Sequence, residues 1–384
     1  MTEKLYTPGP VEASPLVLQA EARPLIHHRT PEFRAELQKA HEGLQRIFRT
    51  DDPVLVLACS GSGAMEAATV NYISPGDRVL VIRGGKFADR WMNIAKAYGA
   101  EVETVEVAWG HAVDPAAVKT ALKAHKDIKV LFGTHSETST GVRHDVQALA
   151  GIAREFDVPF VVDGITSVGA MELRAKEWGI DSVVGGSQKG FMMAPGLGFV
   201  SVSPRARALS AAAKAPRFYF DFRKALKSWE AGDTPFTPAI SLVRSLLVSI
   251  SLIEEEGLEN VWARHARNAQ ATRAAMQALG LKLYPQVSSD ALTTVLAPEG
   301  LTSDAIIKTI LKRNHMRLAN GQDELKGRIF RIGHLGVYQA GDILAVVGAV
   351  EDALSVLGHG IPRGAGLSAA QEILSEPVKV GASA

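Results

Sequence analysis

The sequence of 384 residues has little of several features that would point directly to a function. Its single cysteine, Cys59, cannot form an internal disulfide, and the chain alone cannot supply the cysteine ligands of an iron–sulfur or nickel site. The 42 Lys and Arg residues nearly balance the 41 Asp and Glu residues, without the basic stripe that nucleic-acid binding requires. No apolar run is long enough to span a bilayer, and the N-terminal segment lacks the apolar core of a secretory signal. We therefore expect a cytoplasmic protein with neither a membrane nor a nucleic-acid partner.

Residues 50–205 alternate between short apolar runs and helical stretches. Runs such as VLVLA, RVLVI, KVLFG and FVVD are rich in branched side chains, and most of the runs are followed by a stretch with helical spacing. Strands that are buried on both faces and alternate with helices predict a mainly parallel central sheet covered by helices, the α/β class. Ligands bind beyond the carboxyl ends of such strands, so the residues just after each run are the first candidates for a site.

The pattern changes after residue 237. A long helical region, a strand-like ALTTVLAPE, a helix over 303–315, a hairpin starting at Met316 and a helix over 341–358 predict a smaller α+β domain. We expect four parts: an N-terminal arm (1–20), a large domain (21–258), a small C-terminal domain (259–360) and a C-terminal tail (361–384). The tail is expected to be loose because it is rich in Gly, Ala, Ser and Pro.

Two strand ends carry small and polar residues. CSGSGAMEAA opens a helix behind a strand, and the free backbone N–H groups there favour an anion such as a phosphate. The motif is not a P-loop, and Glu66 stands where the dinucleotide fingerprint requires a small residue. THSETSTGV offers many short hydrogen-bonding side chains, which suit either a polar ligand pocket or a helix cap.

Two charged residues also follow apolar strands. Asp163 ends FVVD, where a buried carboxylate needs a partner; a salt-bridged core acid and a ligand contact are both open. Lys189, in GGSQKGFMM, has no acid beside it in the sequence; a lysine shielded from water has a lowered pKa and becomes a nucleophilic amine. Taken alone, each residue has an ordinary structural explanation. Together, a phosphate site, a strand-end acid and a shielded lysine are the three attachments that pyridoxal phosphate requires.

The motifs TPGP, HRTPEF, GSGAMEA, HSETSTGV, VVDGITSVG, GSQK and RIGHLG follow one another along the chain. In this combination the sequence resembles the class V (fold-type I) pyridoxal-phosphate aminotransferases of the alanine–glyoxylate and serine–glyoxylate type. The resemblance runs from YTPGP to FRIGHLG and implies the fold-type I architecture, with a mainly parallel sheet and a smaller C-terminal α+β domain.

The resemblance assigns a role to individual residues. It makes Lys189 the covalent attachment point and the carrier of the substrate α-proton, and Asp163 the partner of the ring nitrogen. It makes Arg331 the residue that binds the substrate carboxylate, with Gly9 of the PGP turn on the substrate side. It implies no metal site. The residues that it matches to the phosphate and the ring are Ser62, Gly63, Ala64, Gln188, Thr138 and the stacking Phe87. It matches Thr237, or alternatively Thr234, to the phosphate of a neighbouring subunit, which implies a homodimer with shared active sites.

The implied reaction is ping-pong transamination from serine or alanine to a 2-oxo acid, glyoxylate, through a Lys189 Schiff base. An aspartate-specific enzyme is an alternative; it needs a second cation, which Arg23, Arg29 or Arg217 could supply. A phosphonate-type aminotransferase shares TPGP but differs where this chain has HHRTPEF. A partner subunit of a soluble hydrogenase is an alternative of another class, because some relatives carry that name. A nicotinamide-dependent oxidoreductase leaves Lys189 and Arg331 unexplained.

Overall fold

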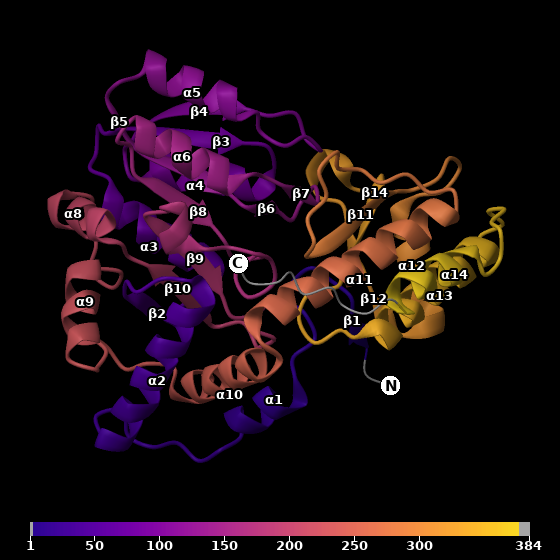
Figure 1. The fold of residues 1–384 in the computed structure, drawn as a ribbon, viewed down its shortest axis with the longest axis horizontal. Helices are drawn as coiled ribbons and strands as arrows, with labels where there is room; N and C mark the ends of the chain where they lie inside the picture. The colour runs from indigo at the N-terminus through magenta and orange to yellow at the C-terminus, as the bar shows by residue number, and fades with distance from the viewer. Residues whose placement is uncertain (1–2, 376–384) are drawn as a thin grey trace.

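The centre of the structure, a computed structural model that describes residues 3–375, is a seven-stranded sheet of order β2-β10-β9-β8-β5-β3-β4 (Figure 1). β10 runs antiparallel to both of its neighbours, whereas the other adjacent pairs are parallel, which confirms the mainly parallel sheet. The strands are Val54–Ala58 (β2), Arg78–Arg83 (β3), Glu101–Glu106 (β4), Ile128–Thr134 (β5), Phe160–Asp163 (β8), Ser182–Gly186 (β9) and Leu197–Ser201 (β10).

Alternate residues of these strands pack into two different apolar clusters. Leu80 and Ile82 belong to one, and their neighbours Val79 and Val81 belong to the other. Because both faces are covered, the inner strands are mainly apolar, whereas the edge strand β4, EVETVE, is mostly exposed or half-buried. Burying each apolar side chain contributes roughly 1.5–3 kcal/mol. One face packs on α2 (Pro31–Phe48), α5 (Pro115–Ala124), α6 (Val146–Glu155), α7 (Ala175–Trp178) and α10 (Ile240–Glu256). The other packs on α3 (Gly61–Tyr72), α4 (Lys86–Ala97), α8 (Pro204–Ala212) and α9 (Phe222–Glu230).

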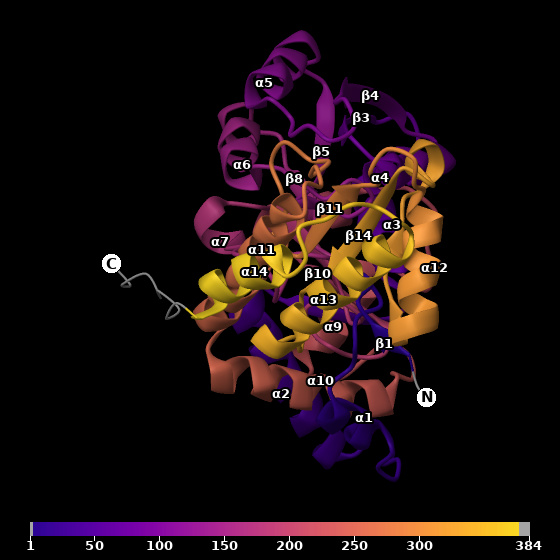
Figure 2. The same ribbon diagram turned by 90° about the vertical axis from the view of Figure 1, so that its right-hand side faces the viewer.

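The C-terminal part contains a three-stranded antiparallel sheet of order β11-β14-β13, from Leu292–Leu296 (β11), Ala319–Asn320 (β13) and Ile329–Gly333 (β14). Figure 2 looks onto this part, with α12 (Ser303–Asn314), α13 (Ala340–Val356) and α14 (Ala365–Ser375) toward the viewer. The hairpin predicted from Met316 is present between β13 and β14. β12 (Met316–Arg317) instead pairs with β1 (Lys4–Leu5) near the N-terminus. The long helical region is divided at Gly257, whose φ of 85° ends α10 before α11 (Leu258–Ala278).

The predicted loose tail is wrong for residues 365–375. This segment forms α14, whose Ala370 and Leu374 are buried in the core of the C-terminal part, together with residues of α11 and α13. The spacing of four residues places both side chains on one face of the helix, so a single apolar stripe is enough to dock it. Of the rest of the predicted tail, residues 361–364 form neither helix nor strand, and 376–384 lie outside the described residues. The limits of the other three parts stay a prediction.

The remaining elements are short: α1 (Pro15–Glu21), which packs against α10, the hairpin of β6 (Ser136–Glu137) with β7 (Val142–Arg143), and the 3-10 helix η1 (Asp323–Leu325). Within residues 3–375, every helix is too short or too polar to cross a membrane.

Candidate active site

A cavity of about 220 Å³ lies at the carboxyl ends of β5, β8 and β9. In a parallel sheet these ends meet at one edge, and the loops that follow them bring distant parts of the sequence together. Seven of the residues predicted from the sequence line the cavity: Gly9, Ser62, Phe87, Thr138, Asp163, Gln188 and Lys189.

Lys189 is buried beside this cavity. Its side chain is 8% exposed, and Nζ donates a hydrogen bond of 2.7 Å to the carbonyl oxygen of Pro8. Burial lowers the pKa of the Lys189 ammonium to about 8, an effect that the nearby Asp163 carboxylate opposes. Gly9 has a φ of 150°, which side chains rarely adopt, and a Cβ there would lie 2.2 Å from Nζ, so glycine is favoured at this position. A large share of Lys189 is therefore a neutral amine at mildly alkaline pH, as a nucleophile requires.

Asp163 lies at the end of β8 with its side chain 5% exposed. Its Oδ1 accepts a hydrogen bond of 2.9 Å from the backbone N–H of Ile165. Burial raises the pKa of the Asp163 carboxyl to about 7, and the negative charge of Glu137 raises it further. A carboxylate in this setting gains stability from any cation placed against it, such as a protonated ring nitrogen.

The start of α3 forms the anion side of the cavity. Ser60 caps the helix, since its Oγ accepts from the N–H of Gly63 at 3.3 Å. The next helical N–H, that of Ala64, already bonds to the carbonyl oxygen of Ser60. Ser62 lines the cavity, whereas Gly63 and Ala64 follow it in the helix, so their predicted phosphate contacts stay a prediction.

Arg90 was missed by the sequence analysis. It lines the cavity, its Nη1 donates to Ser62 Oγ at 2.8 Å, and its guanidinium lies 5.0 Å from the ring centroid of Phe87. The signal was available, because Phe87 and Arg90 are three residues apart in GGKFADR and share one helix face. The cavity thus offers a cation beside the helix N-terminus, which strengthens an anion site.

The class V aminotransferase family matches residues 17–323 of the chain. The chain belongs to the class V aminotransferases. It is 44% identical over 377 residues to a protein of Synechococcus sp. named soluble hydrogenase, small subunit, covering 97% of this chain and 98% of that protein. It is 38% identical over 376 residues to the L-aspartate–glyoxylate aminotransferase of Paracoccus denitrificans, covering 96% and 95%. The solved structure of the ureidoglycine–glyoxylate aminotransferase of Bacillus subtilis superimposes with a TM-score of 0.94 at 29% identity, covering 98% and 99%.

Class V aminotransferases use pyridoxal phosphate, and the cavity fits this cofactor. The residues that would hold it are Lys189, Asp163 and, at the start of α3, Ser62 with Arg90; their individual roles stay a prediction. The buried Oε1 of Gln188 has no hydrogen-bond partner within residues 3–375, which indicates a missing donor at this point.

Arg331 lies beside the cavity rather than among the residues that line it. Its Nη1 donates to the carbonyl oxygen of Thr138 at 2.8 Å, and its Nε and Nη2 donate to that of Asn320 at 2.9 and 2.6 Å. Burial lowers the pKa of the guanidinium to about 10. These carbonyl groups fix the orientation of the guanidinium, which an arginine that binds a carboxylate needs.

The two threonines predicted to contact phosphate lie outside the cavity. Thr234 and Thr237 line a separate apolar cavity. The hydroxyl of Thr234 donates to the carbonyl oxygen of Phe236 at 2.7 Å, whereas Thr237 is exposed. Neither therefore reaches the cavity of its own chain, and a contact with a second subunit stays a prediction.

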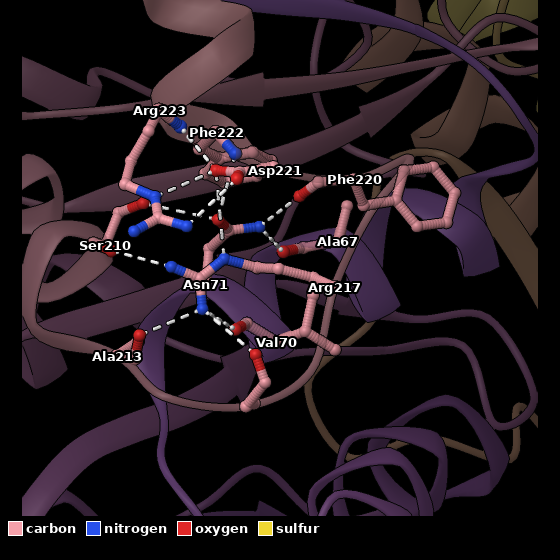
Figure 3. Close-up of polar contacts among 11 residues, drawn as sticks. Ala67, Val70, Asn71, Ser210, Ala213, Arg217, Phe220, Asp221, Phe222 and Arg223 are labelled. Atoms are coloured by element: carbon pink, nitrogen blue, oxygen red, sulfur yellow. Dashed lines mark hydrogen bonds and ion pairs between the residues drawn. The ribbon is translucent and has the colours of Figure 1, made fainter.

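The prediction that Arg217 could serve as a second substrate cation is wrong. Figure 3 shows its guanidinium turned into the protein, where backbone carbonyl groups surround it. The acceptors are the oxygens of Val70, Ser210, Ala213 and Ala215, at 2.9–3.2 Å. Arg217 therefore holds α3, α8 and the following loop together.

Proposed function

We propose that the chain transfers the amino group of a small neutral amino acid, serine or alanine, to glyoxylate. The observation that carries this proposal is the small number of positively charged side chains that line the cavity in the described chain. The cations that line the cavity are Lys189 and Arg90, and Arg90 is engaged with Ser62 on the phosphate side. Arg331 then serves the α-carboxylate, and no second arginine of the described chain lines the cavity to bind a side-chain carboxylate.

In the proposed reaction, some residues of the chain bind the cofactor and substrate, and Lys189 transfers the proton. Bound pyridoxal phosphate supplies an electron-withdrawing ring that stabilises negative charge at the substrate Cα. Asp163 keeps the ring nitrogen protonated, and Arg331 orients the substrate carboxylate. In its neutral form, the Lys189 amine would act as the base that takes the proton from the substrate Cα. The same residues serve the second half-reaction in reverse, in which glyoxylate accepts the amino group.

A donor screen tests this proposal. The holoenzyme is mixed with serine, alanine or aspartate without acceptor, and the change in cofactor absorbance is followed; turnover is then measured with glyoxylate. We expect the highest kcat/KM with serine or alanine. If aspartate is preferred, the proposed donor class is wrong, and the second cation must come from another subunit, with Arg29 as the first candidate. Arg29 is exposed and forms an ion pair with Asp233, in the same segment as Thr234.

We also propose a homodimer whose subunits share their active sites, located in the cytoplasm. The support is an exposed aromatic surface next to Thr237, in which Phe218 is 70% and Tyr219 45% exposed and both pack against Phe236. Mixing Lys189→Ala chains with Thr237→Ala chains, at a cofactor concentration that leaves Thr237→Ala homodimers largely without cofactor, tests this arrangement. A shared site regenerates one intact site in each mixed dimer, so activity returns; a site built from one chain gives no such recovery.

The cyanobacterial relative suggests a second candidate, a subunit of a hydrogenase. That name describes the other protein. In this chain, the buried lysine, acid and anion site in one cavity favour the aminotransferase as the activity of the chain itself, whatever proteins it associates with.

A further inference from the structure

Helix α4, which carries Phe87 and Arg90, begins without a cap of its own. Its N-cap position is Gly85, which has no side chain to accept a hydrogen bond from the first turn. Neighbouring helices are capped from within: Ser60 caps α3, and Asp145 caps α6. The first N–H groups of α4 therefore need acceptors from elsewhere in the chain.

Glu137 provides these acceptors from strand β6. Its Oε2 accepts from the N–H of Phe87 at 3.2 Å and from that of Ala88 at 3.0 Å. Its Oε1 accepts from the N–H of Ser139 at 3.1 Å, and Ser139 Oγ accepts from the N–H of Lys86 at 3.1 Å. Glu137 and Ser139 together take three successive N–H groups of α4.

The fit between the two segments is tight. The Glu137 side chain is 0% exposed, and a Cβ on Gly85 would lie 2.4 Å from its Cδ. Any side chain at position 85 would therefore collide with the Glu137 carboxylate, which occupies that space. Burial raises the pKa of Glu137, while its hydrogen bonds to Ser139 and to the N–H groups of α4 oppose this effect.

The consequence for the cavity follows from the helix geometry. Phe87 and Arg90 lie in the opening turns of α4, and both line the cavity. The first turn of a helix frays unless its N–H groups are satisfied, so the position of both side chains depends on the cap. Thr138, which directly follows Glu137 at the end of β6, lines the same cavity, so the segment that caps α4 also contributes a lining residue.

We propose that Glu137 is a positioning residue of the active site: as the cap of α4, it fixes the Phe87 ring over the cofactor and Arg90 against Ser62. The proposal rests on the proposed roles of Phe87 and Arg90 in cofactor binding. Glu137 itself touches neither substrate nor cofactor and acts through the helix. A merely structural acid would stabilise the fold without changing how the cofactor is held.

Glu137→Gln and Asp181→Asn form a matched pair for the test. Both changes turn a buried carboxylate into an amide, and Asp181 likewise accepts a backbone N–H, that of Phe160 at 2.9 Å, away from the cavity. Hydrogen exchange is measured on the cofactor-free chains, and the Kd of pyridoxal phosphate and the visible circular dichroism are measured on reconstituted ones. For Glu137→Gln we expect about tenfold faster exchange over residues 86–88 and about a tenfold higher Kd, as expected for losing a charge-assisted hydrogen bond.

Asp181→Asn should leave exchange at 86–88, the cofactor Kd and the dichroism unchanged. The proposal is overturned if residues 86–88 of Glu137→Gln exchange at the same rate as in the wild type, or if both variants lose cofactor affinity equally. Should Glu137→Gln fail to fold, Ser139→Ala is used in its place, because it removes the acceptor of the Lys86 N–H. We expect faster exchange at Lys86 and a weaker cofactor complex. No change in either quantity overturns the proposal. A wild-type chain that binds no cofactor contradicts the proposed function instead, and the exchange data are independent of that result.

Discussion

The carboxyl edge of the seven-stranded sheet and the segment 213–239 use their polar groups in opposite ways. At the edge, Asp163 is held by a backbone N–H, and the buried Oε1 of Gln188 has no partner within residues 3–375. In the segment, Arg217 donates to four backbone carbonyl groups, and Thr234 donates to Phe236. The two regions differ in where their unpartnered atoms lie. Gln188 lines the cavity, where a ligand can reach it, whereas the buried donors of the segment that lack a hydrogen-bond partner within residues 3–375, Arg217 Nε and Trp229 Nε1, belong to residues outside that cavity.

The largest expected effect lies at the edge. Lys189→Ala removes the residue proposed both to attach the cofactor and to carry the proton, and we expect kcat/KM to fall by about 10⁴-fold. The half-reaction with a single donor should lose its absorbance change as well. Lys176→Ala, a surface lysine paired with Asp51, is the control and should keep wild-type rates. A Lys189→Ala enzyme with a tenth of the wild-type activity would contradict the assigned role.

The next effect concerns the acid at the same edge. Asp163→Asn keeps the shape and the hydrogen bond from Ile165 but removes the negative charge that is proposed to hold a protonated ring nitrogen. We expect kcat to fall by about 10²-fold, the scale of losing one preorganised electrostatic contact. Stopped-flow absorbance of the first half-reaction measures it. A change below about threefold would mean that the carboxylate is structural.

Much of the fold follows from local sequence pattern, whereas contacts between distant segments do not. Strands buried on both faces leave continuous apolar runs, and parallel strands necessarily bring Asp163 and Lys189 to one edge. The dependence of Phe87 on Glu137 crosses 50 residues and gives no local signal beyond the short polar run THSETSTGV. Helix α14 was missed because its small residues resemble a linker, although Ala370 and Leu374 have helical spacing.

The lowered pKa of Lys189 makes the free energy of unfolding depend on pH. In the cofactor-free protein its pKa is about 8 when folded, against 10.5 as the ordinary value. Between these values only the unfolded chain binds the proton, so the free energy of unfolding rises with pH, by up to about 3 kcal/mol. Below pH 8 the lysine is charged in both states and the cost of burying that charge is fully present.

Chemical denaturation of wild type and Lys189→Met across pH 7–10 isolates this contribution. The stability of wild type should rise relative to the variant over that range. Two parallel curves would show that Lys189 has an ordinary pKa and is not shielded from water.

The smallest expected effect lies in the segment 213–239. Thr237→Ala should raise the Kd of pyridoxal phosphate by about tenfold, because a hydrogen bond from a neighbouring subunit to the phosphate is charge-assisted. Thr234→Ala should leave it unchanged, since that hydroxyl already donates within its own chain. Cofactor titration at fixed protein concentration measures both, and the reverse outcome would assign the contact to Thr234.

One measurement tests the central claim most directly: where the cofactor is attached. The holoenzyme is treated with borohydride, which fixes the cofactor to its amine, then digested and analysed by mass spectrometry. We predict a single modified peptide with the cofactor on Lys189, lost in Lys189→Ala. Modification of an exposed lysine such as Lys86 in its place, or of no residue at all, would contradict the account.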